Sequence, residues 1–304
     1  MKRRNFIAAV PVLGMIQKFE SVKETFPISS NSYNWGTFYS RESKVWGENL
    51  DADMAAYVKT GLQAYEPSLG SAEEATKLIA VLKKYHIKMP SVYIGSVLHE
   101  EEQVEKSIKT ILEIAEVVKN YGTKIIVTNP NPIAWGSDKL KSDEQLTLQA
   151  KALEKIGKSL KMNGLKLAYH THDVELKAGA REFHHMLQNT SPENLYFCMD
   201  VHWVYRGSQN SQLAVFDVLK MYGDRIIELH IRQSKNGIWQ EVFTSDGDID
   251  FKKFALELLK KNLKPHLVIE QCLEKNSPNT MNAFEAHTID LKEIRDTFKL
   301  VLKP

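Results

Sequence analysis

The stretch KIIVTN, residues 124–129, predicts a strand that is apolar on both of its faces. The stretch LVIEQC, residues 267–272, has the same character. Such strands are typical of a parallel sheet that helices cover on both sides. Strand patterns begin near eight positions along the chain: Ile28, Gly61, Lys88, Lys124, Leu165, Leu195, Ile226 and His266. Each interval between them leaves room for a helix and two loops.

Helix signals fill these intervals. Ser71 with Glu74, and Ser142 with Gln145, have the spacing of a capping box at a helix start. Between the third and fourth strands, apolar residues recur at helical spacing and Gly122 closes the pattern: Val104, Ile108, Ile111, Ala115 and Val118. Eight strand-helix units predict an α/β fold, a (β/α)8 TIM barrel.

The competing architecture is a doubly wound open sheet. That fold usually carries a glycine-rich phosphate loop, G-x-G-x-x-G, after its first strand, and the segment after Ile28 has none. No Gly/Ser-rich or Pro-rich linker divides the chain. We therefore expect a single barrel domain over residues 26–304, preceded by a separate segment over residues 1–25.

The composition is that of an ordinary globular protein. The chain has 304 residues, of which 43% are hydrophobic, and 40 Lys and Arg face 38 Asp and Glu. A net charge of +2 without a basic stripe argues against a nucleic-acid partner. No stretch reaches the roughly 18 apolar residues that suggest a membrane span. Cys198 and Cys272 lie in apolar runs, and we expect them to pack as small apolar residues rather than to form a disulfide.

The N-terminal stretch MKRRNFIAAVPVLGMI, residues 1–16, places Arg3 and Arg4 before a short apolar run. This pattern resembles a twin-arginine export signal and favours a periplasmic protein. Pro11 interrupts the apolar run and no clear cleavage site follows, so a basic arm on a cytoplasmic protein is the alternative.

Titratable residues gather where the last four predicted strands end. The stretch LAYHTHDVEL, residues 167–176, places His170 and His172 on one face of an extended chain. The next three strands end in further polar groups: Asp200 and His202, then His230, then Glu270. Barrel enzymes carry their chemistry at these strand ends. We therefore expect the groups to converge.

The set His170, Asp200, His230 and Glu270 suits a divalent metal such as Mn²⁺, Co²⁺, Zn²⁺ or Mg²⁺. Two carboxylates balance the charge of the ion, and two neutral imidazoles leave positions open for substrate oxygens. Any one of these histidines alone is more often a hydrogen-bonded core residue. Their equivalent places on neighbouring strands favour the metal site.

Seven fragments carry a resemblance to a known family: GLQAYEPSL, KMPSVYIG, LAYHTHDVEL, CMDVHWVYRG, ELHIRQS, DGDIDF and LVIEQ. In this order and spacing they resemble the sugar phosphate isomerase/epimerase family, the xylose-isomerase-like barrels, from about residue 28 to the end. The resemblance implies a metal-dependent barrel that acts on a small carbohydrate: a sugar, a keto-sugar or a polyol derivative.

The chain departs from this family at the fifth strand. Ketose 3-epimerases of the family hold their metal with Glu, Asp, His and Glu, and Asp200, His230 and Glu270 match the last three. His170 stands in the place of the first Glu. The resemblance implies that two metal-bound carboxylates act as base and acid, and only Glu270 remains of that pair. His172 or His202 is then the candidate for the second acid or base.

Other residues fall on predicted loops or strand ends of the same face, and they are candidates for substrate binding: Glu66, His99, Glu175, Trp203, Arg206 and Lys235. An aromatic ring can cover the apolar face of a sugar, and Arg or Lys can hold a phosphate or carboxylate. The alternative for the tryptophan is simple packing, and for Arg and Lys a solvated surface.

These expectations lead to a sugar isomerase or epimerase. A base, Glu270 or a histidine, removes the proton next to a carbonyl, and the metal stabilises the enediolate. One alternative is a metal-dependent lyase that acts on 3-keto-glycosides by expelling a β-substituent. Another is a non-enzymatic carbohydrate-binding barrel, which the missing Glu at the fifth strand favours.

Overall fold

A computed structural model describes residues 27–303 of the chain. Its main sheet has eight parallel strands: β1 (Ser29–Asn31), β2 (Ala64–Glu66), β3 (Ser91–Tyr93), β4 (Ile125–Thr128), β5 (Lys166–Tyr169), β6 (Leu195–Asp200), β7 (Ile226–Ile231) and β10 (His266–Ile269). Their order is β2-β1-β10-β7-β6-β5-β4-β3. Each predicted strand is present within a few residues of its expected start.

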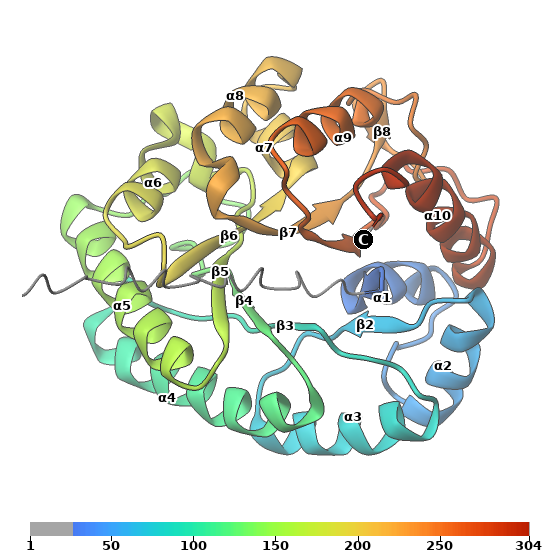
Figure 1. The fold of residues 1–304 in the computed structure, drawn as a ribbon, viewed down its shortest axis with the longest axis horizontal. Helices are drawn as coiled ribbons and strands as arrows, with labels where there is room; N and C mark the ends of the chain where they lie inside the picture. The colour runs from blue at the N-terminus through green and yellow to red at the C-terminus, as the bar shows by residue number, and fades with distance from the viewer. Residues whose placement is uncertain (1–26, 304) are drawn as a thin grey trace, which may run out of the picture.

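The two end strands of this order come together and nearly close the barrel. Ala64 of β2 forms a parallel bridge with Lys88, and Ser68 forms one with Tyr93 of β3. Viewed along the barrel, the strands lie in the centre and the helices form a ring around them (Figure 1). The predicted single TIM barrel is confirmed.

The ring consists of α1 (Ser32–Arg41), α2 (Leu50–Tyr57), α3 (Ala72–Lys84), α4 (Glu101–Val118), α5 (Asp143–Met162), α6 (Lys177–Gln188), α7 (Val201–Gly207), α8 (Gln212–Tyr222), α9 (Phe251–Lys260) and α10 (Ala283–Phe298). A short antiparallel hairpin, β8 (Ser234–Lys235) with β9 (Ile238–Trp239), follows β7. The strand patterns did not indicate this hairpin. It brings Trp239 over the barrel end where β7 stops.

Local sequence signals explain where several helices begin. Ser142 and Gln145 cap α5 reciprocally, as their spacing predicts. The Ser71 hydroxyl accepts a hydrogen bond from the Glu74 backbone N–H. The Glu74 carboxylate accepts from the Gly70 N–H rather than from the Ser71 N–H that a capping box requires. All five of the apolar positions predicted before Gly122 face the core from α4. Gly122 ends the turn that follows this helix, with a left-handed φ of 105°.

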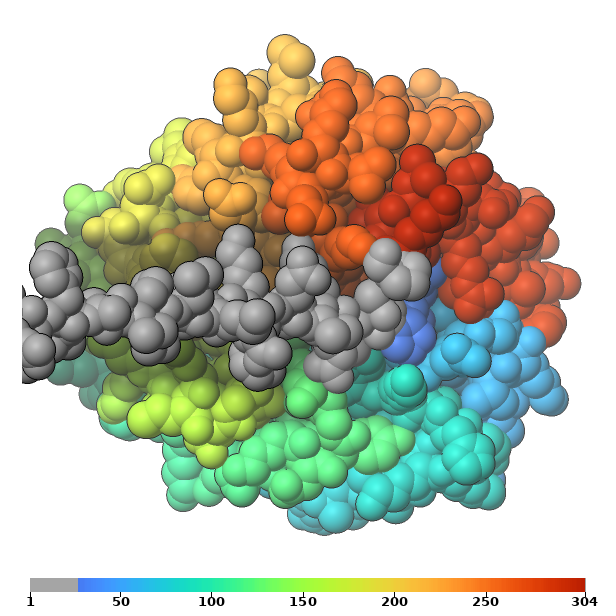
Figure 2. All heavy atoms as spheres, viewed as in Figure 1, coloured from blue at the N-terminus to red at the C-terminus, as the bar shows by residue number. Residues whose placement is uncertain are grey.

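The first and last parts of the barrel pack against each other. Strand β1 pairs with β10, and the blue atoms of α1 lie next to the red atoms of α10 on the surface (Figure 2). Trp35 of α1 stacks on His287 of α10 with ring centroids 4.3 Å apart. The first and last elements of the chain are therefore neighbours, and β1 lies beside β10, the strand that Glu270 directly follows.

Two further expectations concern the cysteines and the membrane. Cys198 and Cys272 are both free and buried, as predicted. Within residues 27–303, no helix combines the length and the apolar character that crossing a bilayer requires. The twin arginine, Arg3 and Arg4, lies outside the described residues.

Candidate metal and substrate site

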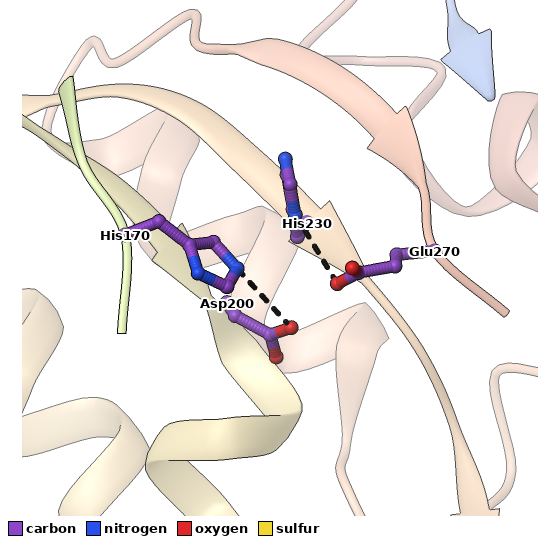
Figure 3. A group of neighbouring side chains, drawn as sticks. All are labelled: His170, Asp200, His230 and Glu270. Carbon is purple, nitrogen blue, oxygen red and sulfur yellow. Dashed lines mark hydrogen bonds and ion pairs between the residues drawn. The ribbon is translucent and has the colours of Figure 1, made fainter. Parts of the chain in front are cut away.

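Four side chains meet at the carboxyl end of the barrel. His170 directly follows β5, Asp200 ends β6, His230 lies near the end of β7, and Glu270 directly follows β10. These strands are neighbours in the sheet, so the four side chains project toward one point (Figure 3). All four are buried, and one donor atom from each lies within 4.8 Å of the others. The structure therefore brings together the four predicted metal ligands.

The distances among these donors suit a shared cation. His170 Nε2 lies 3.7 Å from Asp200 Oδ2, and His230 Nδ1 lies 3.1 Å from Glu270 Oε2. Two donors that bind one ion at about 2.1 Å are themselves about 3 to 3.5 Å apart. Neither ring nitrogen of His170 has a hydrogen-bond partner among the described residues, although the ring is fully buried. A buried imidazole without a partner is costly, and a metal ion would satisfy it. The residues present fit a divalent cation.

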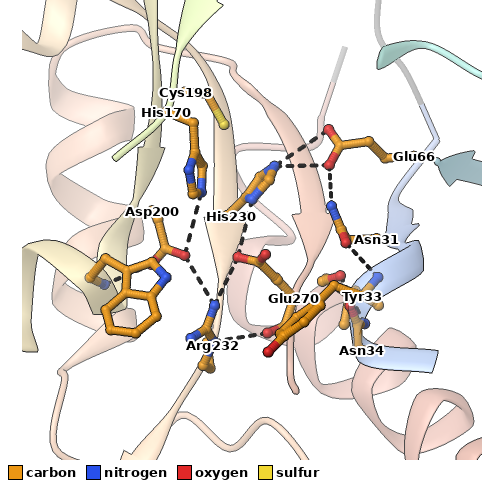
Figure 4. Close-up of polar contacts among 12 residues, drawn as sticks. Asn31, Tyr33, Asn34, Glu66, His170, Cys198, Asp200, His230, Arg232 and Glu270 are labelled. Carbon is orange, nitrogen blue, oxygen red and sulfur yellow. Dashed lines mark hydrogen bonds and ion pairs between the residues drawn. The ribbon is translucent and has the colours of Figure 1, made fainter. Parts of the chain in front are cut away.

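Glu66 stands behind His230. The His230 Nε2 atom lies 3.1 Å from Glu66 Oε1, and Asn31 and Ser91 donate hydrogen bonds to the same carboxylate (Figure 4). Burial would raise the pKa of Glu66, but the charge of His230 and the hydrogen bonds from His230 and Asn31 outweigh it and lower the pKa. With Nε2–H held by a carboxylate, Nδ1 is the nitrogen left to face an ion. The predicted substrate-binding residue Glu66 thus contacts a candidate ligand from inside the barrel.

A second carboxyl group lies below His230. Glu228 of β7 accepts a hydrogen bond from the Cys198 thiol at 3.5 Å and is fully buried. Burial, followed by the charge of Glu66, raises the pKa of Glu228 to about 8. Glu228 is therefore largely uncharged at neutral pH. The negative charge beneath the candidate ion site rests on Glu66.

Arg232 connects the two ligand carboxylates. Its Nη2 atom donates to Asp200 Oδ2 at 3.2 Å and to Glu270 Oε2 at 2.8 Å, as Figure 4 shows. The guanidinium also lies over the rings of Trp203, at 5.1 Å, and Trp239, at 4.2 Å. Arg232 was not among the residues predicted for the site. Its position two residues after His230 was an available signal, because residues two apart in a strand share a face.

The contacts of Glu270 reduce its strength as a base. Burial would raise its pKa, but the neighbouring His230 and Arg232 lower the pKa below the usual value for a glutamate. Glu270 is therefore a carboxylate at neutral pH with little tendency to take a proton. Its geometry suits an ion ligand better than a general base.

His172 is held in an arrangement that suits a base. Its Nδ1 atom lies 3.1 Å from Asn129 Oδ1, and the Asn129 amide donates to Glu175 Oε1 at 3.0 Å. The other Glu175 oxygen accepts from the His172 backbone at 2.7 Å. Because the Asn129 NH₂ group is already used for donation, this network assigns the proton to Nδ1 of His172. The Nε2 lone pair is then available.

The surroundings of His172 keep it uncharged and place it at the mouth of the site. Burial, followed by the neighbouring His170, lowers its pKa well below 6.5. The His172 and His170 rings lie 5.0 Å apart, while Trp135 and Trp203 contact His172 at 5.1 and 5.3 Å. Trp135 is 59% exposed and was not singled out from the sequence. Together the two tryptophans present rings to which a sugar can bind.

The remaining predicted residues divide into two groups. His202 is fully buried, with Nε2 2.8 Å from Ser234 Oγ, and burial lowers its pKa to about 3. Arg206 pairs with Glu274 and lies over Trp239 at 4.4 Å. Both therefore belong to the layer around Trp239.

The other two candidates have different neighbours. His99 is buried, and its nearest charged partner is Glu100 at 3.4 Å. Burial, followed by the charge of Lys141, lowers the pKa of His99. Lys235 is exposed on the hairpin, 3.9 Å from Asp246. No described contact joins His99 or Lys235 to the four candidate ligands. Their predicted role in substrate binding stays a prediction.

A groove of about 1060 Å³ opens beside the site, where β1 and β2 end. Trp46 and Tyr65, joined by a 2.8 Å hydrogen bond, line one part of it, and Gly36 of α1 lines another. Tyr33 also lines the groove and lies beside Arg232 and Glu270 (Figure 4). The groove and the ligand cluster thus meet at Tyr33.

Comparisons with known proteins agree with this architecture. A family model described as xylose isomerase-like TIM barrel matches residues 54–288. The chain is 26% identical to an inosose dehydratase of Mesomycoplasma hyopneumoniae over 264 residues, which cover 78% of this chain and 85% of that protein. It is 23% identical to an inosose dehydratase of Geobacillus kaustophilus over 250 residues, covering 72% and 79%.

Solved structures extend the likeness of the fold. A sugar phosphate isomerase/epimerase from Parabacteroides distasonis has a TM-score of 0.69 at 15% identity, covering 93% of this chain and 97% of that one. A 3-keto-D-glucoside 4-epimerase from E. coli has a TM-score of 0.63 at 16% identity, covering 89% and 99%. A xylose isomerase-like barrel from Mycobacterium smegmatis, solved with magnesium, has a TM-score of 0.68 at 11% identity, covering 92% and 98%.

Proposed function

The chain belongs to the xylose isomerase-like TIM barrel family, and from this membership and the site we propose that it removes the proton next to the carbonyl group of a keto-sugar or a related cyclic polyol. The names of its relatives, inosose dehydratase and 3-keto-glucoside epimerase, both fit chemistry that starts with this step. The observation that carries the proposal is the His172–Asn129–Glu175 network beside the four-donor cluster.

His172 is the proposed base. Its Nε2 atom takes the proton from the substrate carbon, while Asn129 holds Nδ1–H and so keeps the ring in one tautomer and orientation. A well-placed general base typically contributes about 10²- to 10⁴-fold to the rate. This assignment prefers His172 to Glu270, because Oε2 of Glu270 is already engaged by His230 and Arg232, whereas the hydrogen bond to Asn129 uses Nδ1 of His172 and leaves Nε2 for the substrate.

His170, Asp200, His230 and Glu270 would hold a divalent ion. Bound there, the ion would act as a Lewis acid on the substrate carbonyl. The cation of Arg232 lies among the same carboxylates, so negative charge that develops on the substrate oxygen would meet positive charge from the protein as well.

We favour elimination over epimerisation as the outcome. Epimerisation needs a second acid on the opposite face of the carbon, and His170 replaces the carboxylate that this family's epimerases use at the fifth strand. Elimination needs a proton for the leaving group instead. Tyr33 lies where the cluster meets the groove, beside Arg232 and Glu270, and its hydroxyl is the proposed donor of this proton. The substrate class is then a keto-glycoside or keto-polyol with a leaving group β to the carbonyl.

The first experiment incubates the purified protein with each of Mn²⁺, Co²⁺, Zn²⁺ and Mg²⁺ and with 3-keto-glycosides in heavy water. Proton NMR follows exchange of the C–H next to the carbonyl and release of the leaving group. We expect both with wild type and neither with His172→Gln. His185→Gln, on the helix α6, is the matched control and should behave as wild type.

The outcomes separate the candidate activities. Exchange without release would favour an isomerase or epimerase. Substrate binding without exchange, with every metal, would refute the proton-removal proposal and favour a carbohydrate-binding barrel.

Export by the twin-arginine segment is a separate proposal. It rests on Arg3 and Arg4 followed by a short apolar run. Fractionation of cells that make the full chain, with N-terminal sequencing of the mature protein, tests it. A full-length chain confined to the cytoplasm, unaffected by replacement of both arginines with lysine, would contradict it.

A further inference from the structure

Arg232 contacts the same two carboxylate oxygens that face the candidate ligand histidines. Asp200 Oδ2 is 3.2 Å from Arg232 Nη2 and 3.7 Å from His170 Nε2. Glu270 Oε2 is 2.8 Å from Arg232 Nη2 and 3.1 Å from His230 Nδ1. The Nη2 amino group of Arg232 therefore bridges the two carboxylates of the ion site.

The guanidinium is fixed in this position. Arg232 is 1% exposed, and its Nε donates to the backbone oxygen of Glu270 at 2.9 Å. Trp203 and Trp239 contact the guanidinium with their rings. These contacts restrict movement away from the carboxylates when an ion binds. The guanidinium of Arg232 and a bound metal ion must therefore share the carboxylates of Asp200 and Glu270.

Charge then determines how the two cations affect each other. Arginine stays protonated in proteins, so the two carboxylates already face one positive charge before an ion binds. The bridge stops the buried carboxylates from repelling each other and keeps their oxygens directed at the site. The same charge repels a dication in surroundings that screen poorly.

We propose that Arg232 is a built-in counter-ion of the metal site, which holds Asp200 and Glu270 in place before the ion arrives and weakens the affinity of the site for divalent cations. The inference rests on the ion site of the proposed function. The protein alone would then hold the ion loosely, and the carbonyl and hydroxyl oxygens of a bound substrate would complete its coordination.

The test compares ion affinity in wild type, Arg232→Met and Arg232→Lys. Equilibrium dialysis measures the Kd for Mn²⁺ and Co²⁺, and the visible spectrum of Co²⁺ reports its coordination. Arg206→Met is the matched control, because Arg206 lies over the same Trp239 but pairs with Glu274, outside the ligand set. Melting temperatures with EDTA and with Mn²⁺ show whether the ion compensates for the lost charge.

We expect Arg232→Met to bind the ion at least about tenfold more tightly than wild type, since a close like charge is removed from a poorly screened site. Its melting temperature should fall in EDTA and recover with Mn²⁺. Arg232→Lys, which keeps the charge, and Arg206→Met should remain within about threefold of wild type, because the charge beside the carboxylates is retained.

Three results would overturn the proposal: a metal affinity of Arg232→Met that equals or falls below that of wild type, an equal increase of metal affinity in Arg206→Met, or no metal binding by wild type or any variant. If Arg232→Met folds only with metal present, its Kd cannot be measured by dialysis, and the rate at which it loses metal to EDTA is measured instead. If this rate equals that of wild type, the proposal is contradicted. Failure to fold even with metal would assign Arg232 to the fold instead. Metal binding without C–H exchange would leave this inference intact and refute only the proposed reaction.

Discussion

Asn129 Oδ1 lies 3.1 Å from His172 Nδ1, at the point where β4 and β5 end side by side. The backbone of the two strands is paired up to Thr128 and Tyr169, and Asn129 also donates to the backbone oxygen of His170 at 3.0 Å. Asn129 is therefore fixed by the strand that carries His170 and in turn orients His172. This relationship makes Asn129 a positioning residue for the proposed base.

Replacing Asn129 with alanine should lower kcat by about 10- to 100-fold with little change in KM, because a small misplacement of a catalytic group can cost about 10²-fold. Combined with His172→Gln, it should add little further loss, since both changes act on one unit. Steady-state kinetics on the substrate identified by NMR would measure this. Asn131→Ala, two residues along the same loop, serves as the control. If the fold loss of kcat in the double variant equalled the product of the losses in Asn129→Ala and His172→Gln, the assignment would be contradicted.

Glu66 should control metal affinity through His230. Glu66→Gln replaces a charged acceptor of the His230 Nε2–H with a neutral one, and such partners of metal-bound histidines are typically worth about 10- to 100-fold in metal affinity. Metal content after dialysis at a series of free Mn²⁺ concentrations gives the change.

Glu228→Gln is the matched control for this change. Glu228 has a pKa raised to about 8 and is largely protonated at neutral pH, so glutamine resembles its native state. Affinity should stay within about threefold of wild type, because the charge of the site is unchanged. Equal loss in both variants would show that the effect comes from general disturbance of the barrel core.

The sequence was sufficient for the barrel and for the four candidate ligands, because both follow from short-range patterns. Apolar runs place the strands, and parallel topology then brings the ends of β5, β6, β7 and β10 together. Arg232 and Trp135 were not identified, since their roles depend on which side chains come from other segments. Trp239 reaches Arg232 from a hairpin of two-residue strands, and such short strands have no recognisable periodicity.

His99 and Lys235 illustrate the converse. Their places along the sequence put them near strand ends, but the contacts of His99 are with Glu100 and those of Lys235 with Asp246. A sequence pattern gives the end of the barrel on which a residue lies. It does not give the direction of a side chain on a loop.

His287 should make the stability of the barrel depend on pH. The buried ring accepts from Asn34 at 3.0 Å, donates to the Ala283 carbonyl at 2.7 Å, and has its pKa lowered from 6.5 to about 4 by burial. The folded state therefore binds fewer protons than the unfolded state below pH 6.5. Stability from this group is present above pH 6.5 and is lost as pH falls toward 4, by up to about 3 kcal/mol.

Urea unfolding at a series of pH values between 4 and 7 measures this dependence. His287→Gln, which can replace both hydrogen bonds but does not titrate, should flatten the curve in that window. Some slope should remain, because burial also lowers the pKa of His202 and His266. His185→Gln, at a partly exposed position, should leave the slope as it is in wild type. An unchanged slope in His287→Gln would show that His287 is not the titrating group.

Gly36 offers a way to test whether the groove holds the leaving group. It lies on α1 and lines the groove, and a Cβ added there would meet no heavy atom within 4 Å. Gly36→Phe should therefore fold and occupy space in the groove. Because Tyr33 joins the groove to the cluster, KM for keto-glycosides with a bulky leaving group should rise by about tenfold or more, the effect of losing one well-filled apolar contact.

KM for keto-sugars too small to reach the groove should change little, and Gly36→Ala, which adds only a methyl group, should resemble wild type for both. Equal effects of Gly36→Phe on large and small substrates would place the leaving group elsewhere, on the side of Trp135 and Trp203.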